Sequence, residues 1–172
     1  RREPFVKIRI SRCYFGPKKR PPLSKVELMT KPDYKAILAN DPEYRDELVD
    51  GFDYFPEAYL SRLARDGVNG IWLVGYFNEL CKSEIIPEYG EDSDIRLKRL
   101  REIVEKCGRY GIKIYIFCME PSGFGERIPI EIIHAHPELK GNHAGSAYYF
   151  CTSTEAGQAY LDESTYYLFS QV

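Results

Sequence analysis

Apolar and polar positions follow two different periods between residues 68 and 118. Residues 70–74 (Gly-Ile-Trp-Leu-Val) and 112–118 (Ile-Lys-Ile-Tyr-Ile-Phe-Cys) are short and almost entirely apolar, which is typical of parallel strands covered on both faces. Between them, residues 95–110 place an apolar side chain every three or four positions, which predicts an amphipathic helix. The apolar set is Leu97, Leu100, Ile103, Val104 and Cys107. Together these residues predict a βαβ unit with a right-handed crossover.

The same alternation of short apolar runs and amphipathic segments extends in both directions. Residues 6–11 predict a first strand, with a loop beginning near Arg12, and residues 56–66 predict a helix that ends at Gly67. A last helix is predicted from about residue 155 to the end, with a capping box over residues 152–155 (Thr-Ser-Thr-Glu). The order is therefore βαβαβα, and we expect the three strands to pair in parallel and in sequential order.

Long loops follow the strands, and short turns follow the helices. The loops are the insertion 17–55, with short helical pieces expected at 25–29 and 42–49, and the stretches 75–94 and 119–150. In parallel α/β proteins the ligand site lies at the carboxyl ends of the strands, where such loops gather. No Gly-x-Gly-x-x-Gly and no phosphate-loop motif follows a strand, which counts against nucleotide binding.

Composition narrows the class of protein further. The 172 residues are about the length of one domain, and 44% apolar with 29% charged residues is ordinary for a soluble protein. A net charge of -2 gives no electrostatic reason to expect nucleic acid, and no apolar run is long enough to span a membrane. The five cysteines are scattered and odd in number, which predicts reduced thiols and favours a reducing, cytoplasmic compartment.

Four segments resemble the first half of a (β/α)8-barrel glycoside hydrolase, with the family 20 β-N-acetylhexosaminidases as the nearest match. Residues 10–15 (Ile-Ser-Arg-Cys-Tyr-Phe) look like that family's first strand, which ends in an arginine and an aromatic residue. Residues 63–71 resemble its helix leading into the second strand, residues 100–116 its helix and third strand, and residues 136–139 (His-Pro-Glu-Leu) the Tyr-Pro-Glu-Leu that follows. The resemblance implies a partial barrel of about three βα units acting on a carbohydrate.

This sequence departs from the family at the catalytic positions. After its third strand the family carries Asp-x-Pro-Gly-His, whereas residues 119–123 here are Met-Glu-Pro-Ser-Gly. The family's catalytic Asp-Glu pair follows a fourth strand, so we expect it beyond Val172 and assign no catalytic residue within the chain. Three strands cannot close a barrel. We therefore expect either the remainder of a barrel or a self-association partner to cover the sheet edge.

Five residues at the predicted carboxyl ends are candidate contacts to a sugar. The resemblance implies that Arg12 binds sugar hydroxyls, since a guanidinium fork can hold two of them; the alternative is a structural ion pair. Tyr76 and Asn78, with Phe77 between them, follow the second strand, where an aromatic ring beside an amide suits a sugar face and its hydroxyls. Glu79 stands beside them, and local packing is the alternative for each. Glu120 could accept hydrogen bonds from hydroxyls or anchor its loop.

Metal and cofactor chemistry find little support in the sequence. His134 and His136 have the spacing of metal ligands, and His143 lies nearby, but no Cys or carboxylate set completes a site. We therefore expect neither metal nor cofactor. A metal-dependent barrel hydrolase would need His-x-His after the first strand, where residues 11–13 are Ser-Arg-Cys. The remaining alternative is a non-catalytic sugar-binding or scaffold domain that keeps the fold without the chemistry.

Overall fold

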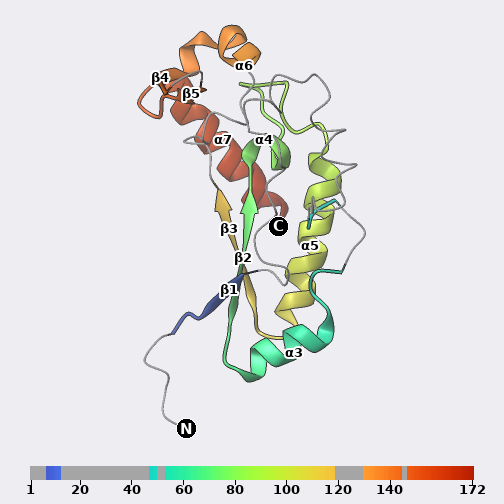
Figure 1. Cartoon of the computed structure of the whole chain (residues 1–172). Helices are drawn as coiled ribbons and strands as arrows, with labels where there is room; N and C mark the ends of the chain where they lie inside the picture. The colour runs from blue at the N-terminus through green and yellow to red at the C-terminus, as the bar shows by residue number, and fades with distance from the viewer. Residues whose placement is uncertain (1–6, 13–46, 50–52, 119–129, 145–146) are drawn as a thin grey trace, which may run out of the picture.

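Three parallel strands form the centre of the fold (Figure 1). The computed structural model describes residues 7–12, 47–49, 53–118, 130–144 and 147–172. Strands β1 (Ile10–Arg12), β2 (Gly70–Gly75) and β3 (Lys113–Cys118) pair in parallel in the order β1-β2-β3. This confirms the predicted strand order, but the predicted bounds 6–11 of the first strand are wrong: residues 7–9 lie outside β1, and Arg12 is its last residue. The described sheet is open and does not close into a barrel.

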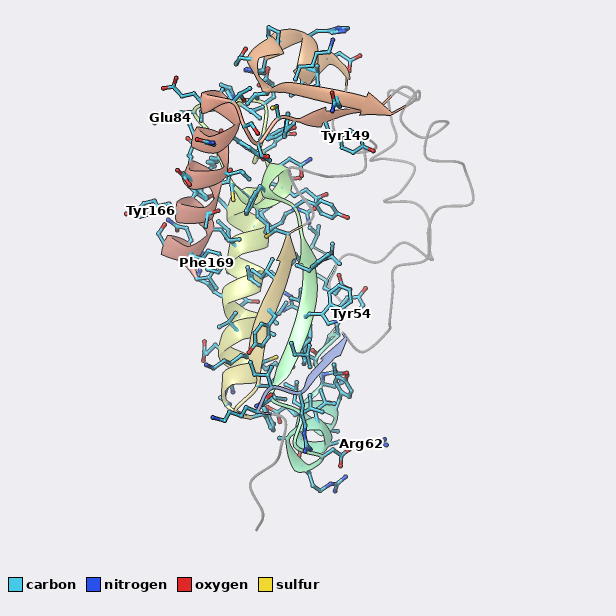
Figure 2. The ribbon with its side chains drawn as sticks, turned by 90° about the vertical axis from the view of Figure 1, so that its left-hand side faces the viewer. Tyr54, Arg62, Glu84, Tyr149, Tyr166 and Phe169 are labelled. Atoms are coloured by element: carbon cyan, nitrogen blue, oxygen red, sulfur yellow. The ribbon has the colours of Figure 1, made fainter. Side chains whose placement is uncertain are left out.

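Three long helices occupy the predicted positions. They are α3 (Glu57–Arg65), α5 (Ser93–Gly108) and α7 (Glu155–Gln171). Helix α3 ends at a turn in which Gly67 has the left-handed φ of 79° that the sequence predicts. Figure 2 shows α5 and α7 on the same side of the sheet. No helix within the described residues is long and apolar enough to cross a bilayer.

Two predicted loops contain regular structure. The stretch after β2, predicted as loop 75–94, begins with the one-turn helix α4 (Phe77–Leu80). The stretch after β3 contains α6 (Ile130–Ala135), the 3-10 turn η1 (Pro137–Leu139) and an antiparallel hairpin of β4 (Lys140–Ala144) and β5 (Ala147–Phe150). Helical pieces of three to six residues are too short to show the helical period, and β4 (Lys-Gly-Asn-His-Ala) lacks the apolar run that marks β2 and β3. The predicted helical piece at 25–29 and residues 42–46 lie outside the described residues, and residues 47–49 form a turn.

A buried apolar core lies on the helix side of the sheet. Ile71 and Leu73 of β2 are 0% and 4% exposed. Helix α5 contributes four of its five predicted apolar positions as buried side chains, namely Leu97, Leu100, Ile103 and Cys107. Burial raises the pKa of the Cys107 thiol to about 11, so this cysteine is a core residue and not a nucleophile. The four cysteines within the described residues carry free thiols.

The opposite face of the sheet carries aromatic side chains and is partly exposed. The rings of Trp72 and Phe117 meet edge to face, with centroids 5.8 Å apart and an interplanar angle of 76°. Phe117 is 53% exposed and Ile10, across the sheet, is 48% exposed. A Cβ on Gly70 would lie 2.8 Å from the Tyr115 ring, so the glycine makes room for that ring. An apolar sheet face with this much exposure is suited to further packing.

The start of α7 is capped differently from the predicted capping box. The N-cap residue is Thr154, whose Oγ1 accepts a hydrogen bond from the Gly157 N–H at 3.1 Å and donates one to the Cys151 carbonyl at 3.0 Å. The predicted box needed Thr152 as the cap and Glu155 at the third helical position. Glu155 instead stands at the first helical position, where its negative charge interacts favourably with the positive end of the helix dipole.

An ion pair ties the segment before α3 to α5. The Asp53 carboxylate accepts hydrogen bonds from Lys106 Nζ at 2.8 and 3.0 Å and from the Phe55 N–H at 3.0 Å. Partial burial of Asp53 raises the pKa of its carboxyl, but the hydrogen bonds from Lys106 and Phe55 outweigh burial, and the net pKa lies below the ordinary value. Asp53 therefore stabilises the fold in its ionised form.

Candidate functional site

Helix α4 follows β2 directly and positions three of the predicted contact residues. Tyr76 is its N-cap residue, and the Tyr76 carbonyl accepts hydrogen bonds from the N–H groups of Glu79 at 3.1 Å and Leu80 at 2.9 Å. Successive side chains on a helical turn diverge by about 100°. Phe77 and Leu80 are consequently buried, at 5% and 1% exposure, whereas Tyr76, Asn78 and Glu79 are half-buried. These three remain partly accessible at the carboxyl end of β2.

Glu79 is held by an arginine from the next helix. Its Oε2 lies 3.6 Å from Nη1 of Arg96, and the two side chains are 29% and 12% exposed. Arg96 stands in the first turn of α5, so the pair joins α4 to α5 across the loop. This geometry matches the structural alternative for Glu79, because a sugar hydroxyl would have to compete with the guanidinium for the carboxylate.

The loop of residues 81–92 folds back onto α4. The Gly90 N–H donates to the Asn78 carbonyl at 3.0 Å. Gly90 has a φ of 76°, and a Cβ there would lie 2.7 Å from the Lys82 nitrogen and in collision with the Cys81 carbonyl. Only glycine fits this approach without strain. The loop therefore closes over α4 as an ordered structure.

Helix α7 fastens the same loop from the other side. The Glu163 carboxylate accepts hydrogen bonds from the Ser83 hydroxyl and from the Glu84 N–H, each at 2.6 Å. The Cys81 thiol donates to the Ser164 carbonyl at 3.3 Å. These contacts join residues about 80 positions apart, so the end of the chain shapes the loop that follows β2.

A buried aromatic cluster lies beneath the loop. The Tyr160 ring of α7 stands at its centre, with centroid distances of 6.5 Å to Phe77, 6.1 Å to Tyr89 and 5.5 Å to Phe150, all edge to face. Tyr160 is 1% exposed. The cluster joins α4, the loop, β5 and α7, and it fixes Phe77 as a core residue instead of a surface for a sugar ring.

His136 lies between two carboxylates at the edge of this assembly. Its Nε2 is 3.1 and 3.3 Å from the two Glu88 carboxylate oxygens, and its Nδ1 is 3.6 Å from Glu138 Oε1. Glu88 accepts a hydrogen bond from its own backbone N–H and another from His136, and both lower the pKa of its carboxyl. His134 is exposed on α6, and the side chain of His143 is outside the described residues. Across the part of the chain that the structure describes, no group of three His, Cys, Asp or Glu side chains is arranged to hold a metal ion.

The other two predicted contacts are not brought to α4. Arg12 pairs in register with Trp72, four positions before Tyr76, which is about 13 Å lower along the strand at about 3.3 Å per residue. The Arg12 side chain lies outside what the structure describes, as does the whole of Glu120. The structure thus gathers Tyr76, Asn78 and Glu79 on one turn and leaves the backbone of residue 12 at a different level.

No sequence pattern signals the polar pairs that hold this region together, although His136 shares with His134 the spacing of metal ligands. Glu163 and Ser83 are 80 positions apart, and His136 and Glu88 are 48 apart; no periodicity or motif signals such polar pairs. No protein family, curated protein or solved structure matches this chain.

Proposed function

We propose that this chain is a carbohydrate-acting domain, a glycoside hydrolase or a portion of one, with the architecture of a partial (β/α)8 barrel. The observation that carries the proposal is the arrangement of the sheet: three parallel strands in sequential order, with α4 and the loop of residues 81–92 following the carboxyl end of β2. Ligands bind at that end in barrels and open α/β sheets. The resemblance to the family 20 β-N-acetylhexosaminidases adds N-acetylhexosamine-containing oligosaccharides or glycoconjugates as the substrate class.

Tyr76 and Asn78 are the best-supported contacts in this proposal. Both are half-buried at the carboxyl end of β2. A partly exposed phenol ring can cover the apolar face of a sugar while its hydroxyl bonds at the rim. The amide nitrogen of Asn78 offers donors to sugar hydroxyls, whereas its Oδ1 is buried. Arg12, Glu79 and Glu120 complete the proposed set. The catalytic acid pair is not assigned within the chain.

A second candidate, a non-catalytic sugar-binding or scaffold domain, is favoured by the state of the carboxylates near α4. Glu79 is paired with Arg96, Glu88 with His136, and Glu163 accepts two hydrogen bonds at 2.6 Å. A general acid needs a carboxyl that can reach the substrate and exchange its proton with it. Carboxylates that are already engaged are better suited to holding the loops in place.

A barrel also requires additional strands beside β1 and β3. The open sheet face is the face opposite the buried core. Its exposed side chains, such as Ile10 and Phe117, would be covered if further strands from another copy of the chain or another polypeptide segment curved the sheet over that face. Self-association is therefore part of the proposal, since unpaired strand edges recruit further strands.

Binding of N-acetylglucosamine oligosaccharides to the purified 172-residue chain tests the proposal. We expect saturation-transfer NMR to detect these ligands, and Tyr76→Ala to weaken binding. Tyr166→Ala is a matched control, because Tyr166 is 79% exposed and projects from the outer side of α7, away from the sheet (Figure 2). Glucose oligosaccharides control for ligand class. Equal signals from both sugars, or equal loss in both variants, would refute the proposed site.

Hydrolysis separates the two candidate functions. If an aryl N-acetyl-β-hexosaminide is cleaved by the chain, or by the chain with a partner that completes the sheet, the enzyme is supported. Binding without hydrolysis under both conditions supports the non-catalytic alternative.

A further inference from the structure

The position of the loop after β2 depends on contacts with segments that follow β3. One end of the loop is bound by Glu163 of α7 through Ser83 and the Glu84 N–H. Its far end is bound by His136, between α6 and η1, through Glu88. The first attachment uses a carboxylate and neutral donors, whereas the second uses an imidazole. Only the second contains a group whose charge ordinarily changes between about pH 5 and 8.

The ring of His136 lies between two carboxylates. A carboxylate faces each ring nitrogen, with Glu88 at 3.1 Å from Nε2 and Glu138 at 3.6 Å from Nδ1. A neutral imidazole has one N–H and one lone pair, so one of its nitrogens would present a lone pair to a carboxylate. The imidazolium presents an N–H to both. The His136 side chain is 16% exposed, which limits the water available to relieve the mismatch.

We infer that protonated His136 is a pH-sensitive latch that fastens the loop of residues 81–92 to the α6–η1 segment, and that the latch loosens when His136 loses its proton. The carboxyl of Glu88 stays ionised across this range because hydrogen bonds from its own backbone N–H and from His136 lower its pKa. The latch therefore strengthens below the pH of histidine deprotonation and weakens above it. This inference does not depend on the proposed carbohydrate function.

Other ionisable side chains lie on the elements next to the pair of His136 and Glu88. They are His134 and Glu131 on α6, Lys140 at the start of β4 and Glu155 at the start of α7. The described ion pairs of the His136 ring are those with Glu88 and Glu138. His134 is exposed on the same segment and lies outside the latch, so it offers a matched control.

Amide hydrogen exchange of the whole chain, corrected for intrinsic exchange rates, tests the latch at about pH 5.5 and about pH 8. We expect protection of amides in residues 84–90 to fall about two- to fivefold at the higher pH, the range for a partly exposed ion pair. Protection in the middle of α5 should not change. His136→Gln should abolish the pH response of the loop, and His134→Gln should preserve it.

If His136→Gln fails to fold, Glu88→Gln tests the pH response of the loop instead. It keeps the size of the side chain but removes the charge that attracts the imidazolium, so the pH response should again disappear. The inference is overturned if wild-type loop protection is the same at both pH values. It is also overturned if either latch variant keeps the wild-type response, or if His134→Gln removes it.

Discussion

Replacing Tyr160 by alanine should destabilise the protein more than any surface change on the same helix. The Tyr160 ring is 1% exposed and contacts three other rings edge to face. Truncating a buried aromatic side chain to alanine costs about 3–5 kcal/mol, because transfer energy is lost and a cavity remains. The edge-to-face contacts, at about 0.5–1.5 kcal/mol each, place Tyr160 toward the upper part of that range.

Urea unfolding followed by far-UV circular dichroism measures the loss in the free energy of unfolding, and heating followed by the same signal measures Tm. A loss of about 3–5 kcal/mol should lower Tm by roughly 6–20 °C for a domain of this size. Tyr166→Ala on the same helix is the control, since its ring is 79% exposed and surface substitutions stay within about 0.5 kcal/mol. A Tyr160→Ala loss below about 1 kcal/mol, or one equal to that of Tyr166→Ala, would show that the cluster does not hold the loop, β5 and α7 together.

Four further substitutions test the proposed sugar contact, the loop after α4, the ion pair of Asp53 and the open sheet face. Arg12→Ala should weaken sugar binding roughly tenfold, since a charge-assisted hydrogen bond contributes about 1.5–3 kcal/mol, with Tm unchanged; a lower Tm with intact binding would indicate a structural ion pair. Gly90→Ala should cost about 1–3 kcal/mol in urea unfolding because of its positive φ and the nearby carbonyl, whereas Gly108→Ala, with nothing within 4 Å of its Cβ, should be neutral or stabilising. Asp53→Asn should cost less than about 1 kcal/mol near pH 7. Because the pKa of Asp53 is lowered by folding, its contribution is present above the pKa of unfolded aspartate, about 3.9, and disappears as pH falls through the folded pKa; a difference that persists in acid would contradict this. Phe117→Asp should shift any self-association toward monomer in sedimentation velocity, and an unchanged distribution would exclude the open sheet face as the contact.

The sequence alone determined the long elements and their order. The apolar runs at residues 70–74 and 112–118 and the three- and four-residue spacing of α5 are periodic signals repeated over several residues. Those signals also favoured parallel pairing, which is typical of strands that are apolar on both faces. The expected covering of both faces is not what the described residues show, since Ile10 and Phe117 leave one face partly exposed. Gly67 follows α3 with a left-handed φ of 79°. The preference of glycine for this conformation depends on the residue type alone, so the end of the helix could be predicted from the sequence.

Only the tertiary structure decided what happens at the carboxyl ends of the strands. The helical pieces α4, α6 and η1 are too short to carry a period. The ring of Tyr160 contacts α4, the loop after it and β5, and polar groups far away in the chain hold that loop. Phe77 shows what a sequence pattern misses. Its neighbours suggested a loop that faces a sugar, but Phe77 is 5% exposed and its ring contacts that of Tyr160. The pairs Glu163–Ser83 and His136–Glu88 bridge 80 and 48 positions. Such pairs form because folding brings two otherwise unremarkable side chains together, and a sequence pattern records distance along the chain but not distance in space.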